Sequence, residues 1–217
     1  MLWILVDILK FLSFLEFLIG LLCYHKFDRA LKFFFLSSVA SMLHGIFFRL
    51  MKNPVQINIE QNLIMILNGT AYFSYFLFQM KETNRKKILI VFFGVLLLLI
   101  SVESKLLGFH TYRIWLTEIV LNLFLLIFSV ISISKISLKN VTQAKKKVNR
   151  LIGMPLVLYL ISSIHYDICV GLLWKRPGEE FLYLFNRLAY FASFLLIICT
   201  IIAYLCQPKQ EPFLQHH

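Results

Sequence analysis

Cysteine is scarce in this chain, and the pairings that usually give cysteine a structural role are missing. The 217 residues include four cysteines, and none of them belongs to a Cys-x-x-Cys pair. We therefore predict neither a disulfide framework nor a zinc site, and we interpret these residues as small apolar side chains. The four are Cys23, Cys169, Cys199 and Cys206.

Motifs of catalytic chemistry are also missing. The chain contains no His-x-x-x-His or Glu-x-x-His spacing, which would place metal ligands on one helix face. Ser41 and Ser162 each stand three residues before a histidine, but that spacing on a helix is weak evidence for a hydrolase. We expect no metal, no cofactor and no enzymatic activity.

Charge is sparse as well. Charged residues make up 15% of the chain, hydrophobic residues make up 59%, and the mean hydropathy is +0.78. A soluble domain of this size does not need so much apolar surface, so the expected solvent is lipid. Seven apolar runs have the length of about 20 residues that matches the bilayer core. They lie at roughly 2–24, 33–51, 62–80, 88–108, 115–135, 151–173 and 181–206.

The first apolar run lacks the features of a cleavable signal peptide. It has no basic start and no small-residue cleavage site, and it carries Asp7, Lys10 and Glu16. We expect it to remain as the first membrane helix. Little sequence is left outside the seven runs, so we expect one membrane domain without a soluble catalytic or output module.

Acidic residues are half as frequent as basic ones, and the net charge of +11 is unevenly placed. The loops after the first, third and fifth runs hold most of the lysines and arginines. This positive-inside pattern predicts an outside N-terminus and a cytoplasmic C-terminus, most simply in a plasma (inner) membrane. Lys145, Lys146 and Lys147 are expected to touch anionic lipid headgroups. Because the charge lies in these loops, we expect no nucleic-acid partner.

What the chain does contain is an internal similarity. The sequence Asn-Gly-Thr-Ala-Tyr-Phe at 68–73 resembles Asn-Arg-Leu-Ala-Tyr-Phe at 186–191. A Ser-x-x-His precedes each copy, ending at His44 and His165, and an acid followed by isoleucine precedes both, at Asp7 and Glu118. Three matches in the same order predict a duplication.

The duplication predicts a domain organisation. Runs one and five are separated by three others, so they cross the membrane in the same direction and the repeat is parallel. We predict an all-α bundle of seven transmembrane helices in a 3+1+3 arrangement. Its parts are a first repeat at 1–80, a linker helix with its loops at 81–114, a second repeat at 115–206 and a short cytoplasmic tail at 207–217.

Polar residues inside the runs are the candidates for a binding site. Burying them in lipid is unfavourable, so they are expected to face the bundle interior or a wet cavity. On the third run they follow i, i+4, i+7 spacing, which places them on one helix face. Two such faces are expected to converge on a pseudo-twofold pocket that opens outward. The candidate ligand-binding residues are Asp7, His44, Asn68, Tyr72, Glu118, Asn122, His165, Asn186 and Tyr190.

Each candidate also has a purely structural interpretation. A buried asparagine often only holds helices together, by about 0.6 kcal/mol on average. The two histidines are equally well interpreted as satisfied core residues, and Tyr72 and Tyr190 as packing groups. Glu16 stands apart, because no basic residue is expected at its depth. It is predicted to be either protonated or exposed to water.

The topology and length resemble those of SWEET and PQ-loop carriers. In SWEET-type carriers a pair of asparagines on the third and seventh helices faces the substrate, and Asn68 and Asn186 resemble that pair. The chain departs from the class in lacking a Pro-Gln motif, and Pro155 is the one hinge proline present. The topology also resembles that of microbial rhodopsins, but the seventh run has no lysine to bind retinal.

The resemblance and the polar residues together imply a small solute carrier with a polar ligand. The alternative is a seven-helix sensor or receptor that binds a small ligand outside and signals through a partner protein. The chain is broadly similar to the seven-helix sensor regions that precede bacterial histidine kinases. Assembly as a homo-oligomer is compatible with either function, and an intramembrane enzyme is the least favoured interpretation.

The orientation is directly testable. In a background without the four native cysteines, the Lys146→Cys variant is expected to react with a membrane-impermeant maleimide only after the cytoplasmic side is exposed, because the basic loops lie inside. Labelling is measured on intact and on permeabilised cells. Reaction on intact cells would reverse the predicted orientation.

Overall fold

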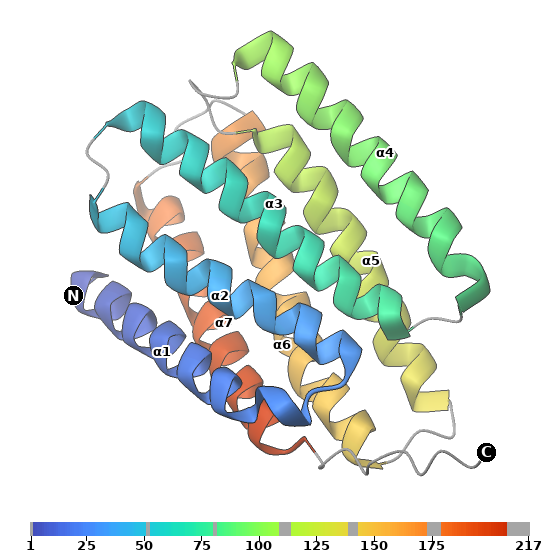
Figure 1. Ribbon diagram of the computed structural model, residues 1–217. Helices are drawn as coiled ribbons and strands as arrows, with labels where there is room; N and C mark the ends of the chain where they lie inside the picture. The colour runs from blue at the N-terminus through green and yellow to red at the C-terminus, as the bar shows by residue number, and fades with distance from the viewer. Residues whose placement is uncertain are drawn as a thin grey trace.

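The computed structural model is an all-α bundle (Figure 1) and describes residues 2–50, 53–79, 82–108, 114–138, 143–172 and 179–207. No strand occurs among these residues, which confirms the predicted all-α class. The long α-helices are α1 (Leu2–Cys23), α2 (Arg29–Leu50), α3 (Pro54–Gln79), α4 (Glu82–Leu107), α5 (Trp115–Leu138), α6 (Gln143–Tyr166) and α7 (Glu179–Leu205). A short 3₁₀ helix, Tyr24–Lys26, follows α1, and a π-helical turn, Asp167–Leu172, extends α6.

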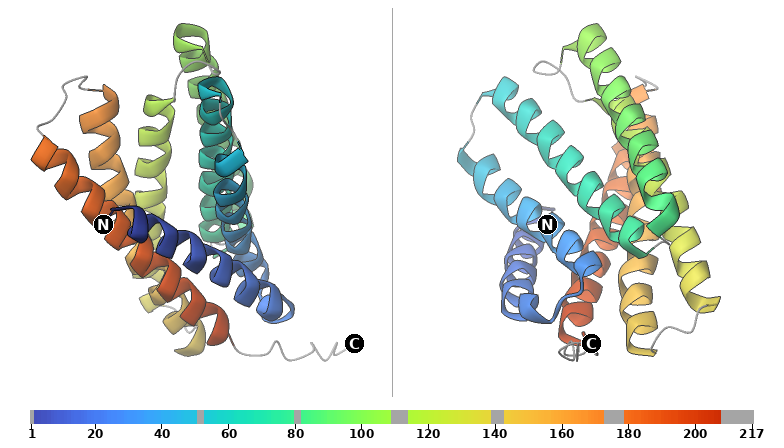
Figure 2. Two further views of the ribbon diagram at one scale, coloured as in Figure 1. Left: turned by 90° about the vertical axis from the view of Figure 1, so that its left-hand side faces the viewer. Right: turned by 45° about the vertical axis from the view of Figure 1, so that its right-hand side comes forward.

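Six of these helices form a closed ring. Along the ring α1 packs on α2, α2 on α3, α3 on α5, α5 on α6, α6 on α7, and α7 returns to α1. Helix α4 lies outside the ring, against α5 and α3 (Figures 1 and 2). The ring encloses the space in which the candidate site lies.

Four helical stretches are long and apolar enough to cross a membrane by themselves: Arg85–Leu106, Trp115–Ser134, Lys145–Cys169 and Arg187–Leu205. They belong to α4, α5, α6 with its π-turn, and α7. The sequence predicts seven spans, and the described parts of α1, α2 and α3 do not meet the same criterion. In α1 the apolar run is interrupted by Asp7, Lys10 and Glu16.

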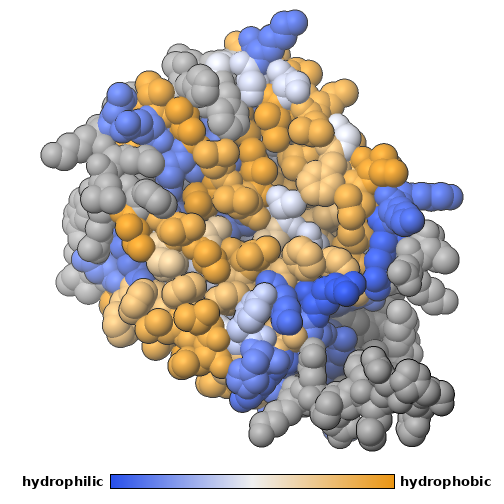
Figure 3. Space-filling view, viewed as in Figure 1, coloured by the Kyte–Doolittle hydropathy of each residue, from blue (hydrophilic) through white to orange (hydrophobic). Residues whose placement is uncertain are grey.

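The outer surface is compatible with an integral membrane protein. Large apolar side chains project from the outward face of α4, where Ile90 is 72% and Leu106 is 77% exposed. Figure 3 shows an apolar band over the middle of the molecule, with hydrophilic side chains gathered toward two ends. Such a continuous apolar surface is unfavourable in water and typical of lipid contact.

The basic segments meet at one end of the bundle, which we call the basic end. Lys145 Nζ at the start of α6 lies 2.9 Å from Asp28 Oδ2, just before α2. Arg85, near the start of α4, donates a hydrogen bond of 3.0 Å to the carbonyl of Phe78 near the end of α3. The loops grouped by charge in the sequence therefore share one end of the structure. Which side of a membrane that end faces stays a prediction.

Aromatic side chains pack the part of the bundle nearest the basic end. Phe27 and Tyr204 are fully buried, with ring centroids 4.7 Å apart, and they join the start of α2 to the end of α7. Phe34 contacts the rings of Tyr72 and Tyr75 at 5.3 and 5.2 Å. Aromatic rings thus make up much of the packing between α2, α3 and α7 near the basic end.

A carboxylate on helix α4 bonds to the ring, in addition to the packing of Phe92 on Phe73 of α3. Glu103 accepts hydrogen bonds from the backbone N–H groups of Leu116 and Thr117 at 2.9 and 2.8 Å, and from the Thr117 hydroxyl at 2.7 Å. These N–H groups belong to the first turn of α5, and N–H groups in a first turn have no acceptor within their own helix. Glu103 therefore acts as a helix cap supplied by a neighbouring helix.

Close packing of α3 on α5 depends on Gly69, and this yields a prediction. A Cβ at Gly69 would overlap the buried side chain of Leu121, whereas a Cβ at Gly94 on α4 would meet nothing within 4 Å. We expect Gly69→Ala to lower stability by about 1–3 kcal/mol through overpacking. Gly94→Ala is expected to be neutral or to raise stability by up to about 1 kcal/mol through helix propensity.

The measurement is thermal unfolding of both variants purified in the same detergent. Equal midpoints for the two variants would show that the Gly69 contact does not limit the approach of α3 to α5.

Candidate functional site

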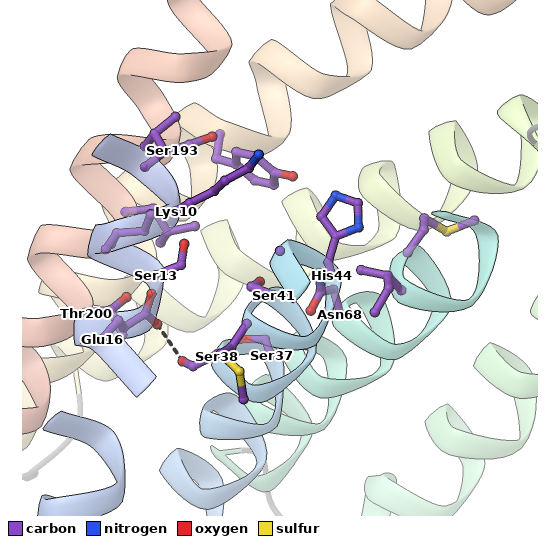
Figure 4. Close-up of a pocket in the computed structure, with 18 of the residues that line it drawn as sticks. Lys10, Ser13, Glu16, Ser37, Ser38, Ser41, His44, Asn68, Ser193 and Thr200 are labelled. Carbon is purple, nitrogen blue, oxygen red and sulfur yellow. Dashed lines mark hydrogen bonds between the residues drawn. The ribbon is translucent and has the colours of Figure 1, made fainter. Parts of the chain in front are cut away.

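The ring of six helices encloses a cavity of about 1270 Å³ (Figure 4). Ligand pockets in proteins typically measure about 300–1,000 Å³, so this one is large enough for an organic molecule. Its polar lining includes Asp7, Lys10, Ser13, Glu16, Ser37, Ser38, Ser41, His44, Gln61, Asn68, Tyr72, Glu118, Asn122, Tyr159, Ser163, Tyr190, Ser193 and Thr200. Every ring helix contributes to this lining.

Most residues that the sequence marks as candidates meet in this cavity. Asp7, His44, Asn68, Tyr72, Glu118, Asn122 and Tyr190 all line it. His165 does not: its side chain is exposed, and Nδ1 lies 2.8 Å from the carbonyl oxygen of Ile161 on its own helix. Asn186 belongs to α7, but its side chain lies outside the described residues.

Glu16 is the main polar residue of the cavity that the candidate set leaves out. It is 6% exposed, and its Oε1 accepts a hydrogen bond of 2.5 Å from Ser38 Oγ. Ser38 Oγ also lies 2.9 Å from Tyr204 Oη. Because the Ser38 proton is directed to Glu16, Tyr204 is the donor to Ser38. This chain of hydrogen bonds links α1, α2 and α7 at the deep end of the cavity.

Two buried oxygens of the lining have no hydrogen-bond partner among the described residues. They are Oγ1 of Thr200, whose side chain is 1% exposed, and Oδ1 of Asn68. Buried polar atoms are nearly always paired, so each such exception needs an explanation. Since both residues line the cavity, a bound ligand or water would supply the missing partner.

His44 lines the cavity and is also held by a neighbouring helix. Its Nδ1 lies 2.7 Å from Oε1 of Glu60 on α3, and Glu60 is buried. The pair joins α2 to α3 near the end of the bundle that carries the N-terminus. His44 thus combines the two alternatives that the sequence leaves open, a satisfied histidine and a cavity residue.

Asn122 also has a structural partner. Its Nδ2 donates to Ser163 Oγ at 3.2 Å and to Asp167 Oδ2 at 3.4 Å, and so joins α5 to α6 and its π-turn. Asp167 is fully buried within that turn. The interaction is the kind of interhelical hydrogen bond that holds membrane helices together.

The cavity is closed toward the basic end. Its lining stops there at Phe34 on α2, Tyr72 on α3, Leu125 on α5 and Tyr159 on α6. The aromatic contacts of Phe34 continue beneath it, as described above.

Below that layer lies a polar cluster, which we call the seal: Tyr75 and Gln79 on α3, Ser132 on α5 and Asn149 on α6. Tyr75 Oη donates to Asn149 Oδ1, which also accepts from Gln79 Nε2 at 3.0 Å. Ser132 Oγ donates to Gln79 Oε1 at 2.6 Å. The seal therefore connects three helices. It joins α3, from the first half of the chain, to α5 and α6, from the second half, through the Asn149 oxygen and the Gln79 side chain.

Comparison with known proteins adds no assignment. No family model matches this chain, and no curated protein or solved structure matches it either. The resemblance to SWEET and PQ-loop carriers stays an expectation, and the function has to be argued from the cavity.

The seal yields a prediction. Asn149→Leu removes the acceptor shared by Tyr75 and Gln79 and leaves the Tyr75 hydroxyl buried without its partner, so we expect a loss of about 1–3 kcal/mol in stability. The matched control is Ser134→Ala on α5, because Ser134 is exposed and bonds only to the Val130 carbonyl of its own helix. Thermal unfolding in detergent checks both variants; an unchanged midpoint for Asn149→Leu would mean that the seal adds nothing to stability.

Proposed function

We propose that this protein is a seven-span integral membrane protein that binds a small polar ligand in the central cavity and carries it across the membrane. The observation that supports the proposal best is the cavity itself, with polar side chains from all six ring helices around about 1270 Å³. Space of this size, lined by groups that are unfavourable in lipid, is typical of a solute site.

The order of the ring supports the two-repeat interpretation. Exchanging α1, α2 and α3 for α5, α6 and α7 leaves every neighbour relation in the ring unchanged. Helix α4 stands outside the ring, as a linker between the segments 1–80 and 115–206 would. Carriers built from parallel repeats commonly bind their substrate at the interface of the halves.

In a carrier, the closed end of the cavity is a gate. Release toward the basic end would require the seal of Tyr75, Gln79, Ser132 and Asn149 to separate. All three hydrogen bonds of the seal cross between α3 on one side and α5 and α6 on the other. Movement of one three-helix half against the other would break them together, while Phe34 and Tyr75, which both belong to the first half, would move as one.

The same closure supports a sensor as the second candidate. If the seal never opens, occupancy of the cavity changes helix packing without transport, and the signal passes to a partner protein. In either case the basic end is proposed to face the cytoplasm, with Lys145, Lys146 and Lys147 at anionic headgroups of the plasma membrane.

The test compares Asn68→Leu with His165→Gln in a thermal-shift screen of sugars, amino acids and small acids. Asn68 Oδ1 has no partner among the described residues, so leucine at this position is expected to leave the fold stable. A ligand hydroxyl or amide left without its partner would lose about 1–3 kcal/mol, or roughly 5- to 150-fold in affinity. His165→Gln is expected to bind like the wild type, because His165 does not line the cavity.

Uptake of a compound found in this screen into proteoliposomes then separates the two candidates. Accumulation inside the vesicles supports the carrier, and binding without accumulation supports the sensor. A screen in which no compound stabilises the wild type, or in which Asn68→Leu responds unchanged, would contradict the proposed site.

A further inference from the structure

Three carboxylates line the cavity, and one of them, Glu16, differs from the other two. Asp7 and Glu118 interact with other groups, whereas Glu16 accepts a hydrogen bond from Ser38 and has no cationic partner among the described residues. We infer that the ligand carries an ammonium group, which binds against Glu16 at the deep end of the cavity; this inference rests on the proposed ligand-binding function.

Glu16 is the residue that makes this inference specific. Its side chain is almost completely buried but lines the cavity. Within the described part of the chain, no lysine, arginine or histidine forms an ion pair with it. Lys10 lies six residues earlier on α1, which is about 9 Å along the helix axis at a rise of about 1.5 Å per residue. A buried carboxylate without a cationic partner is strongly unfavourable, so a cationic ligand would stabilise it.

The hydrogen bonds around Glu16 leave its carboxylate able to accept a further hydrogen bond from a ligand. Tyr204 donates to Ser38, and Ser38 donates to Glu16 Oε1, so both hydroxyl protons point toward the carboxylate. These bonds fix the position of the carboxylate and leave it able to accept further hydrogen bonds, because an ionised carboxylate has about four acceptor sites.

The unpartnered oxygens of the lining also favour a donor. Thr200 stands one helical turn before Tyr204, on the same face of α7. Its hydroxyl, which can donate or accept, has no partner among the described residues, and Oδ1 of Asn68 across the cavity, which can only accept, has none either (Figure 4). An ammonium group has three N–H donors and no acceptor, which complements the Glu16 carboxylate and the Thr200 oxygen at the deep end, while Asn68 Oδ1 would accept from a donor elsewhere on the ligand. A carboxylic acid ligand would add charge of the same sign beside Glu16.

Size and aromatic content indicate an organic ammonium ion and not a metal ion. The volume of about 1270 Å³ far exceeds what a single ion fills. No group of three His, Cys, Asp or Glu side chains is placed to hold a metal ion in the part of the chain that the structure describes. Tyr72, Tyr159 and Tyr190 line the walls, and aromatic rings attract cations of this type.

The experiment uses the detergent-purified full chain and three probes with the same aromatic body. Tyramine is cationic, tyrosol is neutral and 4-hydroxyphenylacetate is anionic; putrescine and spermidine extend the cationic set, and sodium chloride serves as the metal-ion probe. Dissociation constants come from the dependence of the unfolding midpoint on probe concentration at constant ionic strength. We expect amines to stabilise the wild type, while the neutral and anionic probes do not.

Three variants test the assignment of Glu16 and Thr200. Glu16→Gln keeps the size of the side chain and is expected to weaken amine binding at least tenfold. Thr200→Val is expected to weaken it about fivefold while the midpoint without probe stays equal or rises, because valine removes an unpartnered buried hydroxyl. The control Ser129→Ala, a buried hydroxyl outside the cavity that bonds to the Leu125 carbonyl, is expected to bind amines like the wild type.

Each contrary result has a defined meaning. If tyrosol or 4-hydroxyphenylacetate stabilises the protein and the amines do not, the ammonium inference is wrong and the proposed ligand-binding function stands. If amines bind Glu16→Gln as tightly as the wild type, Glu16 is not the anchor and the inference is wrong. If sodium alone stabilises the protein and Glu16→Gln abolishes this effect, the site binds a metal ion instead. If no probe shifts the midpoint, both the inference and the proposed function are contradicted.

Circular dichroism of each variant confirms that its helices are intact.

Discussion

Ser38 holds the first and last helices of the ring together. Its hydroxyl bonds to Glu16 on α1 and to Tyr204 on α7, so one small side chain joins three helices where α1 packs on α7. Opening this contact would break two hydrogen bonds between buried groups, which is unfavourable. The rings of Phe27 and Phe35 pack against that of Tyr204 at the same point. The shape of the cavity depends on this closure, because α1 and α7 form one of its walls.

The polar residues of the interior separate into two groups with different consequences. Asn122, Asn149, Glu60 and Glu103 each have a partner on another helix, and these bonds fix the spacing of the ring and of α4. Asn68 and Thr200 line the cavity with an oxygen that has no partner among the described residues. A residue in the first group stabilises the empty protein, whereas one in the second group is unfavourable until something binds. Stability and recognition are therefore assigned largely to different side chains within the same small space, and Glu16 takes part in both, through its bond to Ser38 and as the inferred anchor of the ligand.

The sequence predicts part of this architecture well. Apolar runs locate the helices because burial in lipid requires them, and the run at 2–24 agrees with α1 at Leu2–Cys23. The third and sixth runs are too short, since α3 begins at Pro54 and α6 at Gln143. The first turns of α3 and α6 are polar, so hydropathy alone does not detect them. Side-chain hydrogen bonds, such as the one between His44 and Glu60, stabilise such polar helix ends. The seven predicted spans exceed the four that meet the length and apolarity criterion among the described residues; in α1 the charged residues Asp7, Lys10 and Glu16 interrupt the apolar run.

The candidate site shows the same limit. Helical spacing indicates which residues share a face, so Asn68 and Tyr72 could be assigned to one side of α3. Spacing gives no partner on another helix, and for that reason the bond from Ser38 to Glu16 could not be predicted. The Ser-x-x-His similarity marks His165 as the counterpart of His44, yet the two side chains differ in surroundings: His44 lines the cavity and His165 is exposed.

Helix α4 contributes no residue to the described lining of the cavity, yet the cavity depends on it. Each helix reverses the direction of the chain, so the single helix between the two halves makes α5 run parallel to α1. If the chain passed directly from α3 to the second half, that half would be inverted end to end. The polar positions of Glu118, Asn122 and Tyr190 would then lie at other depths, away from those of Asp7 and Asn68. An outlying helix with an apolar surface thus sets the level at which the polar side chains of the two halves face each other, although it adds none of its own to the described lining.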